Sequence, residues 1–389
     1  MHDVVLAAGR DRSVRRRHPW VLSGAVARVD GEPSAGEQVR VVSAEGEALG
    51  FGHYAPASQI RVRLLCFGKD APGDGLLAER ITHAVSRRSR DPLLDGTDAL
   101  RLVNAEGDGL PGLTVDRYAD TLVLRCSSAG MHARATLLAD TLREVTGAAA
   151  GYQRDDGVAA RRDGFEAHQG PLWGSPPDGP IGITERGRRY EVDLLHGQKT
   201  GFYLDQRDAR DLVQRLARGR RVLDLFSYTG GFAVAAACGG AASLTLVDSS
   251  SEALRVAARN LGLNHAASTT RFVEEDAFRF VRQDDAGYDL LVVDPPPLAK
   301  RKSDVQRAAR AHKDVLLFAL RRAAPGAFVL VFSCSHAVDA TLFRQIAFGA
   351  SLDAGRSVQV LATLGAPSDH PVSIDHPEGS YLTGLLLRA

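Results

Sequence analysis

Cysteine is scarce in this sequence, and its four cysteines lie far apart with no CxxC spacing: Cys66, Cys126, Cys238 and Cys334. That distribution argues against a structural zinc site and against a disulfide framework. We therefore expect free thiols, no bound metal and a protein of the reducing cytoplasm.

An excess of charge of one sign is also absent. The 48 Lys and Arg residues almost balance the 47 Asp and Glu residues, and the formal net charge is +1. This balance excludes a histone-like protein that binds nucleic acid through bulk charge, so any nucleic-acid surface must be a local patch. Only five of the 48 cationic side chains are lysine, and arginine is the residue that suits bidentate contacts with phosphate.

Long hydrophobic runs are missing as well. The longest, LLVV before Asp294 and AFVLVF before Ser333, have the length of a strand and fall far short of a membrane span. The first twenty residues contain no apolar core of signal-peptide length. We expect no membrane segment and a cytoplasmic location, in a chain whose 389 residues suggest two or three domains.

The local patterns divide the chain into three parts. Residues 1–70 alternate apolar and polar positions around glycines, which is typical of a small β-rich domain. Residues 74–173 combine helical stretches with two strands around a glycine-rich turn, and they predict an α+β middle domain. After a linker rich in proline and glycine, residues 183–389 alternate near-continuous apolar strands with helices. This last pattern predicts an α/β domain whose parallel sheet is covered on both faces and binds ligands at the carboxyl ends of its strands.

An arginine-rich arm lies near the start of the sequence. Residues 10–17 contain five arginines and one aspartate, and His18, Pro19 and Trp20 follow. A charge run of this kind is commonly a solvated face. An aromatic residue beside it in a compact β module is, however, a combination common in RNA-binding domains. Both interpretations stay open from the residues alone.

A candidate ligand loop follows the strand-like segment that contains Asp224. The loop leads to Gly230 and Gly231 and then to a helix, and glycines let the backbone approach a ligand closely. It is not a GxGxxG motif and lacks the lysine of a phosphate-binding loop, so neither a dinucleotide nor a triphosphate is favoured. On its own, a glycine pair after a strand is more often only a tight turn.

Acidic residues also stand at the ends of the next two strands. Asp248 comes 24 residues after Asp224, the position of a ribose-hydroxyl acceptor in a nucleoside-binding βαβ unit. Asp276 follows the next strand, where its carboxylate would accept a hydrogen bond from an adenine amino group. Each carboxylate alone is more often a helix cap or a solvated turn. Three of them at successive strand ends favour a nucleoside site.

The order of the segments DLFSYTGGF, LVD, EDAF and DPPP resembles class I S-adenosylmethionine-dependent methyltransferases, whose catalytic domain is Rossmann-like. The preceding segment, GQKTGFYLDQRDAR, is similar to a signature of RNA 5-methylcytosine methyltransferases of the large-ribosomal-subunit type. The resemblance covers essentially the whole chain. It implies an N-terminal PUA domain, an α+β middle domain and a catalytic domain that uses S-adenosylmethionine to methylate 23S ribosomal RNA or a large-subunit precursor. The sequence itself does not fix the oligomeric state, although members of the family often form homodimers.

The resemblance also implies a set of cofactor contacts. Asp224 and Gly230 would border the methionine moiety. Asp248 would hold the ribose, and Asp276 would reach the adenine. The other residues assigned to the cofactor pocket are Phe202, Asp205, Arg207, Tyr228 and Asp294.

One cysteine is a candidate nucleophile. Carbon 5 of cytosine is too weakly nucleophilic to attack a sulfonium unaided, so enzymes first add a thiolate to carbon 6. Cys334 follows an apolar strand in the motif FSCSH and should lie at a carboxyl strand end, unlike the other three cysteines. Position and family motif together favour the catalytic interpretation, although a single cysteine is commonly a small buried hydrophobe.

Asp294 is the candidate general acid, because it follows another strand and would face the cytosine edge. Enzymes that methylate exocyclic amines commonly carry Asn-Pro-Pro-aromatic here, whereas this chain has aspartate and no aromatic residue in the segment DPPPL that ends at Leu298. This difference argues against amine methylation. No residue is identified for removal of the proton from carbon 5.

The target base must leave its stack to reach the thiol and the methyl donor. The residues expected to contact RNA are Arg15, Arg16, Arg17, Trp20, Pro295, Lys300, Lys302 and His370. Two alternatives stay open. One is a methyltransferase that acts on another base or RNA, in which Cys334 is dispensable. The other is a non-catalytic RNA-binding assembly factor, which need not bind S-adenosylmethionine.

Overall fold

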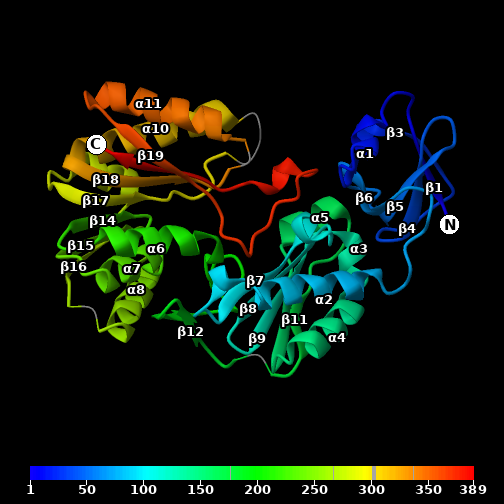
Figure 1. The fold of residues 1–389 in the computed structure, drawn as a ribbon, viewed down its shortest axis with the longest axis horizontal. Coiled ribbons are helices and arrows are strands. Elements are labelled where there is room, and N and C mark those ends of the chain that lie inside the picture. The colour runs from blue at the N-terminus through cyan, green and yellow to red at the C-terminus, as the bar shows by residue number, and fades with distance from the viewer. Residues whose placement is uncertain (176, 266, 300–303, 336) are drawn as a thin grey trace. The chain divides into compact units, whose positions relative to one another are not determined.

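The computed structural model (Figure 1) describes residues 1–175, 177–265, 267–299, 304–335 and 337–389. Contacts along the chain divide it into two compact units. The first unit consists of Met1–Ile181, Asp193–Phe202 and Ser368–Gly379. The second unit consists of Gly182–Val192, Tyr203–Pro367 and Ser380–Ala389.

The first unit begins with a six-stranded sheet of order β2-β6-β5-β4-β1-β3. Its strands alternate buried and exposed positions, as in β4, and the buried side chains form a separate apolar core. The β-rich first part predicted from the sequence is confirmed. Its elements are β1 (Asp3–Leu6), α1 (Arg12–Arg15), β2 (Trp20–Leu22), β3 (Val26–Asp30), β4 (Gln38–Val42), β5 (Ala48–Tyr54) and β6 (Ile60–Phe67).

A five-stranded sheet of order β11-β10-β9-β8-β7 follows, and α2 and α4 pack against each other beside it. The strands are β7 (Ala99–Asn104), β8 (Leu113–Tyr118), β9 (Thr121–Cys126), β10 (Ala150–Arg154) and β11 (Gln169–Trp173). The helices are α2 (Leu76–Ser89), α3 (Ala129–His132), α4 (Ala135–Thr146) and α5 (Gly157–Asp163).

The predicted strand count around the glycine-rich turn was wrong, because β7, β8 and β9 are three strands rather than two. The second turn, between β8 and β9, contains Ala119 with φ of 51° and Asp120 instead of a glycine. A turn without glycine or proline gives little local signal, so the sequence pattern runs through it.

The segments Asp193–Phe202 and Ser368–Gly379 fold with the first unit, although the sequence places them in the domain predicted for residues 183–389. The Tyr118 hydroxyl lies 2.8 Å from the Thr200 hydroxyl and accepts a hydrogen bond from the Phe202 N–H at 3.2 Å. Arg88 donates to the main-chain oxygen of Asp369 at 2.9 Å. These bonds join residues that are far apart in the sequence, so local periodicity could not predict them.

The second unit is built on a seven-stranded sheet of order β16-β15-β14-β17-β18-β20-β19. The first five of these strands are parallel, whereas β20 runs antiparallel to β18 and β19. Its strands are β14 (Arg221–Leu225), β15 (Ser243–Asp248), β16 (Thr269–Glu274), β17 (Tyr288–Val293), β18 (Ala323–Ser333), β19 (Gln359–Leu364) and β20 (Thr383–Arg388). A separate hairpin consists of β12 (Ile181–Glu185) and β13 (Arg188–Val192).

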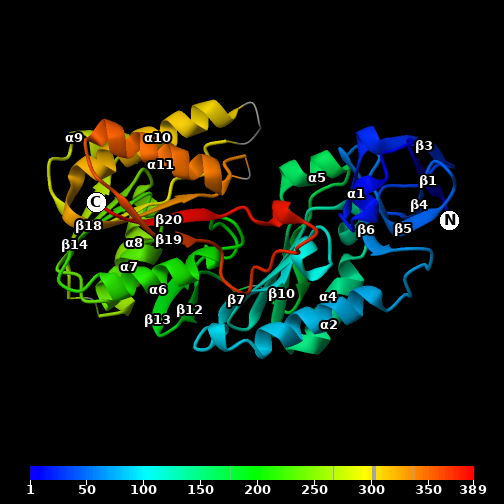
Figure 2. The ribbon, with the colours of Figure 1, turned by 45° about the horizontal axis from the view of Figure 1, so that its top comes forward.

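Helices cover both faces of this sheet, with α10 and α11 on one side and α6, α7 and α8 on the other (Figure 2). The predicted α/β fold with a Rossmann-like sheet is confirmed. The helices are α6 (Arg207–Leu216), α7 (Gly231–Cys238), α8 (Ser251–Leu263), α9 (Ala277–Gln283), α10 (Val305–Arg322) and α11 (Ala340–Ala354). Within the described ranges, none of the helices has the length and apolar character needed to cross a membrane.

Candidate active site

The site lies where four parallel strands of the second unit end. In the sheet register Leu225 lies opposite Val247 on one side and Val293 on the other, and Val293 pairs with Val331. Because these strands run parallel and in step, the residues that follow them come to one edge of the sheet. The carboxylates and the cysteine predicted from the sequence therefore share this edge.

Asp224 is buried with 2% of its surface exposed, and neither oxygen of its carboxylate has a hydrogen-bond partner in the described part of the chain. Burial raises the pKa of Asp224 well above its ordinary value, and the nearby charges of Asp294 and Asp248 raise it further. A buried carboxylate without a partner is costly. The arrangement suits a ligand that brings a cationic or hydrogen-donating group.

The loop between β14 and α7 holds an unusual backbone. Phe226 and Tyr228 have φ of 61° and 46°, values that residues with a side chain rarely adopt. Gly230 has φ of 78°, and a Cβ atom there would lie 2.8 Å from the Cβ of Ala257. Strained loops of this kind cluster at ligand sites. Glycine is required at position 230 because the backbone passes directly against α8.

Two of the predicted cofactor carboxylates are also held by backbone amides. Asp248 accepts hydrogen bonds from the Tyr228 N–H at 2.8 Å and the Ser250 N–H at 2.9 Å. Asp276 is the N-cap of α9 and accepts from the Arg279 N–H at 2.9 Å. The capping role that the sequence left open for Asp276 is thus present. Each carboxylate has further acceptor positions for a ligand, so both cofactor roles stay predictions.

Cys334 and Asp294 follow the neighbouring strands β18 and β17. Cys334 is half-buried, and its thiol donates to the main-chain oxygen of Pro295 at a distance of 3.9 Å. The Gln206 side-chain amide donates to Oδ2 of Asp294 at 3.0 Å. The thiol therefore lies beside the loop that carries the candidate acid. The catalytic roles of the two residues stay predictions.

Sequence reasoning missed Tyr203 and Gln206 as site residues. Burial raises the pKa of Tyr203, and the charges of Asp294 and Asp205 raise it further. The Tyr203 ring packs edge-on against the Tyr228 ring, with 5.7 Å between the centroids. Tyr203 and Gln206 both lie inside the segment GQKTGFYLDQRDAR, whose resemblance to a family signature could have pointed to them. The direction of their side chains was not predictable from that segment.

Comparisons with known proteins agree with this geometry. Residues 112–343 match the family model described as S-adenosylmethionine-dependent methyltransferase, and residues 4–67 match a PUA-like domain. The chain is 42% identical to ribosomal RNA large subunit methyltransferase I of Escherichia coli O1:K1 / APEC over 99% of its own length and 98% of the relative. The protein of the same name from Escherichia coli O9:H4 (strain HS) is 41% identical over the same shares.

The chain belongs to the S-adenosylmethionine-dependent methyltransferases. Among them it belongs to the family of ribosomal RNA large subunit methyltransferase I, which confirms the resemblance found in the sequence. A methyltransferase solved in complex with SAH superposes with a TM-score of 0.86 at 21% identity, and one from Streptococcus mutans with 0.84 at 21%. Both alignments cover 100% of each chain and show that the fold is shared over its full length.

The methyltransferase uses S-adenosylmethionine, and its strand-end residues fit that cofactor. The sulfonium and the ammonium group of the cofactor are cationic, and the buried carboxylate of Asp224 has no partner in the described part of the chain. The glycine at position 230 lets the loop that follows β14 pack directly against Ala257 of α8. Within the described ranges, no group of three or more His, Cys, Asp or Glu residues is positioned to hold a metal ion.

Three of the predicted pocket residues lie in the segment GQKTGFYLDQRDAR, and their surroundings differ. Asp205 accepts a hydrogen bond from the Tyr381 hydroxyl at 2.6 Å. Phe202 is buried in the first unit, where its N–H bonds to Tyr118. Arg207 is fully buried in the second unit. Their roles at the cofactor of the methyltransferase stay predictions.

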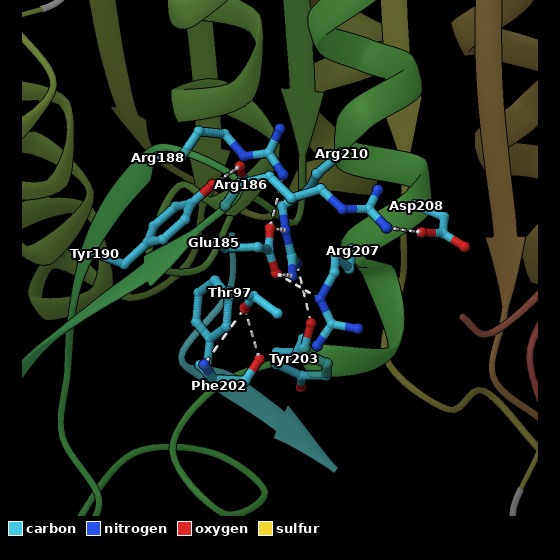
Figure 3. A network of polar contacts seen from close by, with 12 residues as sticks. Thr97, Glu185, Arg186, Arg188, Tyr190, Phe202, Tyr203, Arg207, Asp208 and Arg210 are labelled. Carbon is cyan, nitrogen blue, oxygen red and sulfur yellow. Dashed lines mark hydrogen bonds and ion pairs between the residues drawn. The ribbon is translucent and has the colours of Figure 1, made fainter. Parts of the chain in front are cut away.

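Arg207 belongs to a buried ionic cluster around Glu185 (Figure 3). Arg210 contacts both carboxylate oxygens at 2.7 and 2.5 Å, Arg188 lies at 3.0 Å and Arg207 at 3.8 Å. Arg210 also donates to the main-chain oxygen of Tyr203 at 3.0 Å. The cluster thus ties the hairpin of β12 and β13 to the segment that carries Tyr203.

The residues of the arginine-rich arm are in part engaged within the protein. Arg15 pairs with Asp11 at 2.6 Å and with Glu47 at 2.5 Å. Arg16 is exposed, and Arg17 lies 5.7 Å from the centre of the Phe67 ring. Of the three arginines predicted to contact RNA, Arg15 is therefore paired with carboxylates.

The other predicted RNA contacts differ in exposure. Trp20 is half-buried, and its indole N–H donates to Glu106 at 2.8 Å. His370 is only 4% exposed and bonds to Asp369 at 2.9 Å within the first unit. Pro295 is buried beside Cys334. Lys300 and Lys302 lie outside the described residues.

Replacing Gly230 by alanine should weaken S-adenosylmethionine binding at least about tenfold and lower stability by about 2 kcal/mol or more. The left-handed backbone costs an L-residue about 1–2 kcal/mol, and the clash with Ala257 adds to it. Isothermal titration calorimetry and urea unfolding measure the two effects.

Gly219→Ala is the matched control for this variant, because Gly219 has φ of 69° and no atom within 4 Å of an added Cβ. It should lower stability by only the backbone cost and leave cofactor affinity unchanged. Equal cofactor affinity of the Gly230→Ala variant and the wild type would contradict the assignment of this loop.

Proposed function

We propose that this methyltransferase methylates carbon 5 of a cytosine in large-subunit ribosomal RNA, such as 23S RNA or its precursor, through a covalent adduct with Cys334. The observation that carries the proposal is the position of the Cys334 thiol, 3.9 Å from the main-chain oxygen of Pro295 and at the strand edge shared by Asp224 and Asp294. The relatives at 42% and 41% identity are named for ribosomal RNA of the large subunit, which supports the choice of substrate.

The Cys334 thiolate forms a bond to carbon 6 of the extruded cytosine, and the electron pair of the C5–C6 double bond moves to carbon 5. The bound cofactor supplies an electrophilic methyl group on a sulfonium. Carbon 5 takes this methyl group as the carbon–sulfur bond of the sulfonium breaks. A base then removes the proton from carbon 5, the double bond re-forms and the thiolate of Cys334 leaves.

Asp294 has the position of a general acid in this sequence of steps. Gln206 fixes Oδ2 of its carboxyl group through the 3.0 Å hydrogen bond. A proton passed from Asp294 to ring nitrogen 3 of cytosine makes carbon 6 more electrophilic, and the proton returns when the thiolate leaves.

The proposal also assigns a role to each of the three parts of the chain. Residues 1–70 would form the RNA-binding PUA domain, residues 74–173 the middle domain and residues 183–389 the catalytic domain. Ribosomal RNA as substrate implies a cytoplasmic location. The homodimer implied by the family resemblance stays a prediction that analytical ultracentrifugation tests.

Bisulfite mapping of ribosomal RNA from a deletion strain tests the proposed function. Bisulfite converts cytosine but spares 5-methylcytosine, so one cytosine of the large-subunit RNA should lose its protection in the deletion strain. Protection should return with the wild-type gene and not with the Cys334→Ala variant. An unchanged map together with loss of a methyl group from another base would assign a different reaction. An unchanged content of all methylated bases would favour an assembly factor.

A further inference from the structure

Helix α2 of the middle domain presents a row of basic side chains. The positions follow the spacing i, i+3, i+7 and i+10, which lies on one face of a helix. Successive members are separated by about one helical turn, or about 5.4 Å along the axis. The members are Arg80, His83 and Arg87 on the helix and Arg90 at its end.

These side chains line an open groove of about 360 Å³. Its complete lining is Arg80, His83, Ser86, Arg87, Arg90 and Asp108. His83, Arg87 and Arg90 are exposed to solvent in the full chain. The groove contains no large apolar side chain, which an anchor for a protein partner normally needs.

The single carboxylate of the groove does not cancel its positive charge. Asp108 is buried and receives two hydrogen bonds of 2.7 Å from Arg88, which lies behind the groove. Arg87 touches one oxygen of Asp108 at 3.0 Å, but 60% of its side chain remains exposed. Because Arg88 compensates Asp108, the groove keeps an excess of positive charge.

The row also combines fixed and available donors. Arg80 is held by the main-chain oxygens of Leu65, at 2.6 Å, and Gly109, and neither partner neutralises its charge. His83 and Arg90 form no side-chain hydrogen bond or ion pair with any residue in the described ranges. The groove thus offers oriented cationic donors to an anionic ligand.

We propose that this α2 groove binds the phosphodiester backbone of the substrate RNA. The inference rests on the proposed function, because it assigns to the ribosomal RNA a contact surface outside the catalytic site. A row of basic side chains with a spacing of one helical turn suits consecutive phosphates of one strand. The N-terminal arm is a weaker candidate, since Arg15 is already paired with Asp11 and Glu47.

Replacing Arg90 by glutamate tests the proposal without touching an ion pair of the described structure. We expect the affinity for a large-subunit ribosomal RNA transcript to fall about 5- to 20-fold. The slope of log Kd against log salt should decrease by about one per lost phosphate contact. The double variant Arg87→Glu/Arg90→Glu should show a larger loss of affinity. S-adenosylmethionine affinity should be unchanged in both variants.

The matched control is Arg143→Glu, which makes the same charge change at an exposed position of α4 in the same domain. It should bind the transcript as the wild type does. Wild-type affinity and salt slope for Arg90→Glu would overturn the proposal, even if activity on assembled subunits fell, since that result would indicate a protein partner. The binding assay does not depend on methyl transfer, so a failure of the proposed cytosine chemistry would appear separately.

Discussion

Replacing Cys334 by alanine should reduce methyl transfer to RNA by more than about 10⁴-fold, because removal of a covalent nucleophile leaves no route around the unreactive carbon 5. Cofactor binding should persist, since the cysteine touches the Pro295 loop rather than the Asp224 and Gly230 loop. Transfer of a tritiated methyl group to ribosomal RNA measures the first effect, and calorimetry with S-adenosylmethionine measures the second.

A trapping experiment gives this prediction a covalent readout. RNA that carries 5-fluorocytosine at the target position should form a stable adduct with the wild-type protein, because the fluorine at carbon 5 cannot be removed as a proton is. The Cys334→Ala variant should form no adduct. Cys238→Ala is the control, because Cys238 is an exposed cysteine at the end of α7 and away from the strand edge. Retained activity of Cys334→Ala would refute the covalent route and favour attack on another base atom.

Replacing Glu185 by glutamine should destabilise the protein by about 3–5 kcal/mol, because it leaves buried arginines without their counter-charge. Glu185, Arg188, Arg207 and Arg210 are all buried, and the partly exposed Asp211 also contacts Arg188 at 2.6 Å. The free energy of unfolding in urea measures the loss. Glu191→Gln is the control, because its ion pair with Arg259 is exposed and should contribute no more than about 1 kcal/mol.

Glu185 also makes the free energy of unfolding depend on pH in the acidic range. Burial alone would raise the pKa of Glu185, but the charges of Arg210, Arg207 and Arg188 outweigh it and lower the pKa to about 2. The pKa of Glu185 is lower in the folded state than in the unfolded state. At pH values between these two pKa values, the unfolded state therefore binds more protons than the folded state. The contribution, about 3 kcal/mol, is therefore present above the unfolded pKa near 4.5 and is lost as the pH falls toward 2. The Glu185→Gln variant should lack this part of the acid dependence, and an identical pH profile for both proteins would contradict it.

The strand-end residues were predictable because a parallel sheet has a regular geometry. Once the apolar strands were recognised, the residues after them had to meet at one edge, and Asp224, Asp248, Asp294 and Cys334 do so. The glycine at position 230 was recognised for the same reason. In each case a local pattern and a rule of topology were sufficient.

Contacts between distant segments were not predictable in this way. The position of Tyr203 depends on Arg210, and that arginine depends on Glu185 of another element. His370 was expected near the RNA, yet it is buried beside Asp369, whose side chain accepts from the Arg101 N–H at 3.0 Å. Such arrangements follow from tertiary packing, and sequence periodicity carries no information about them.

The segments Asp193–Phe202 and Ser368–Gly379 restrict how the two compact units could be exchanged by recombination. Neither compact unit is one continuous stretch of polypeptide, because the backbone passes from one to the other several times. A recombination event with a single breakpoint would deprive one unit of strands or segments that complete it. The two units therefore cannot be exchanged intact through a single breakpoint in the gene.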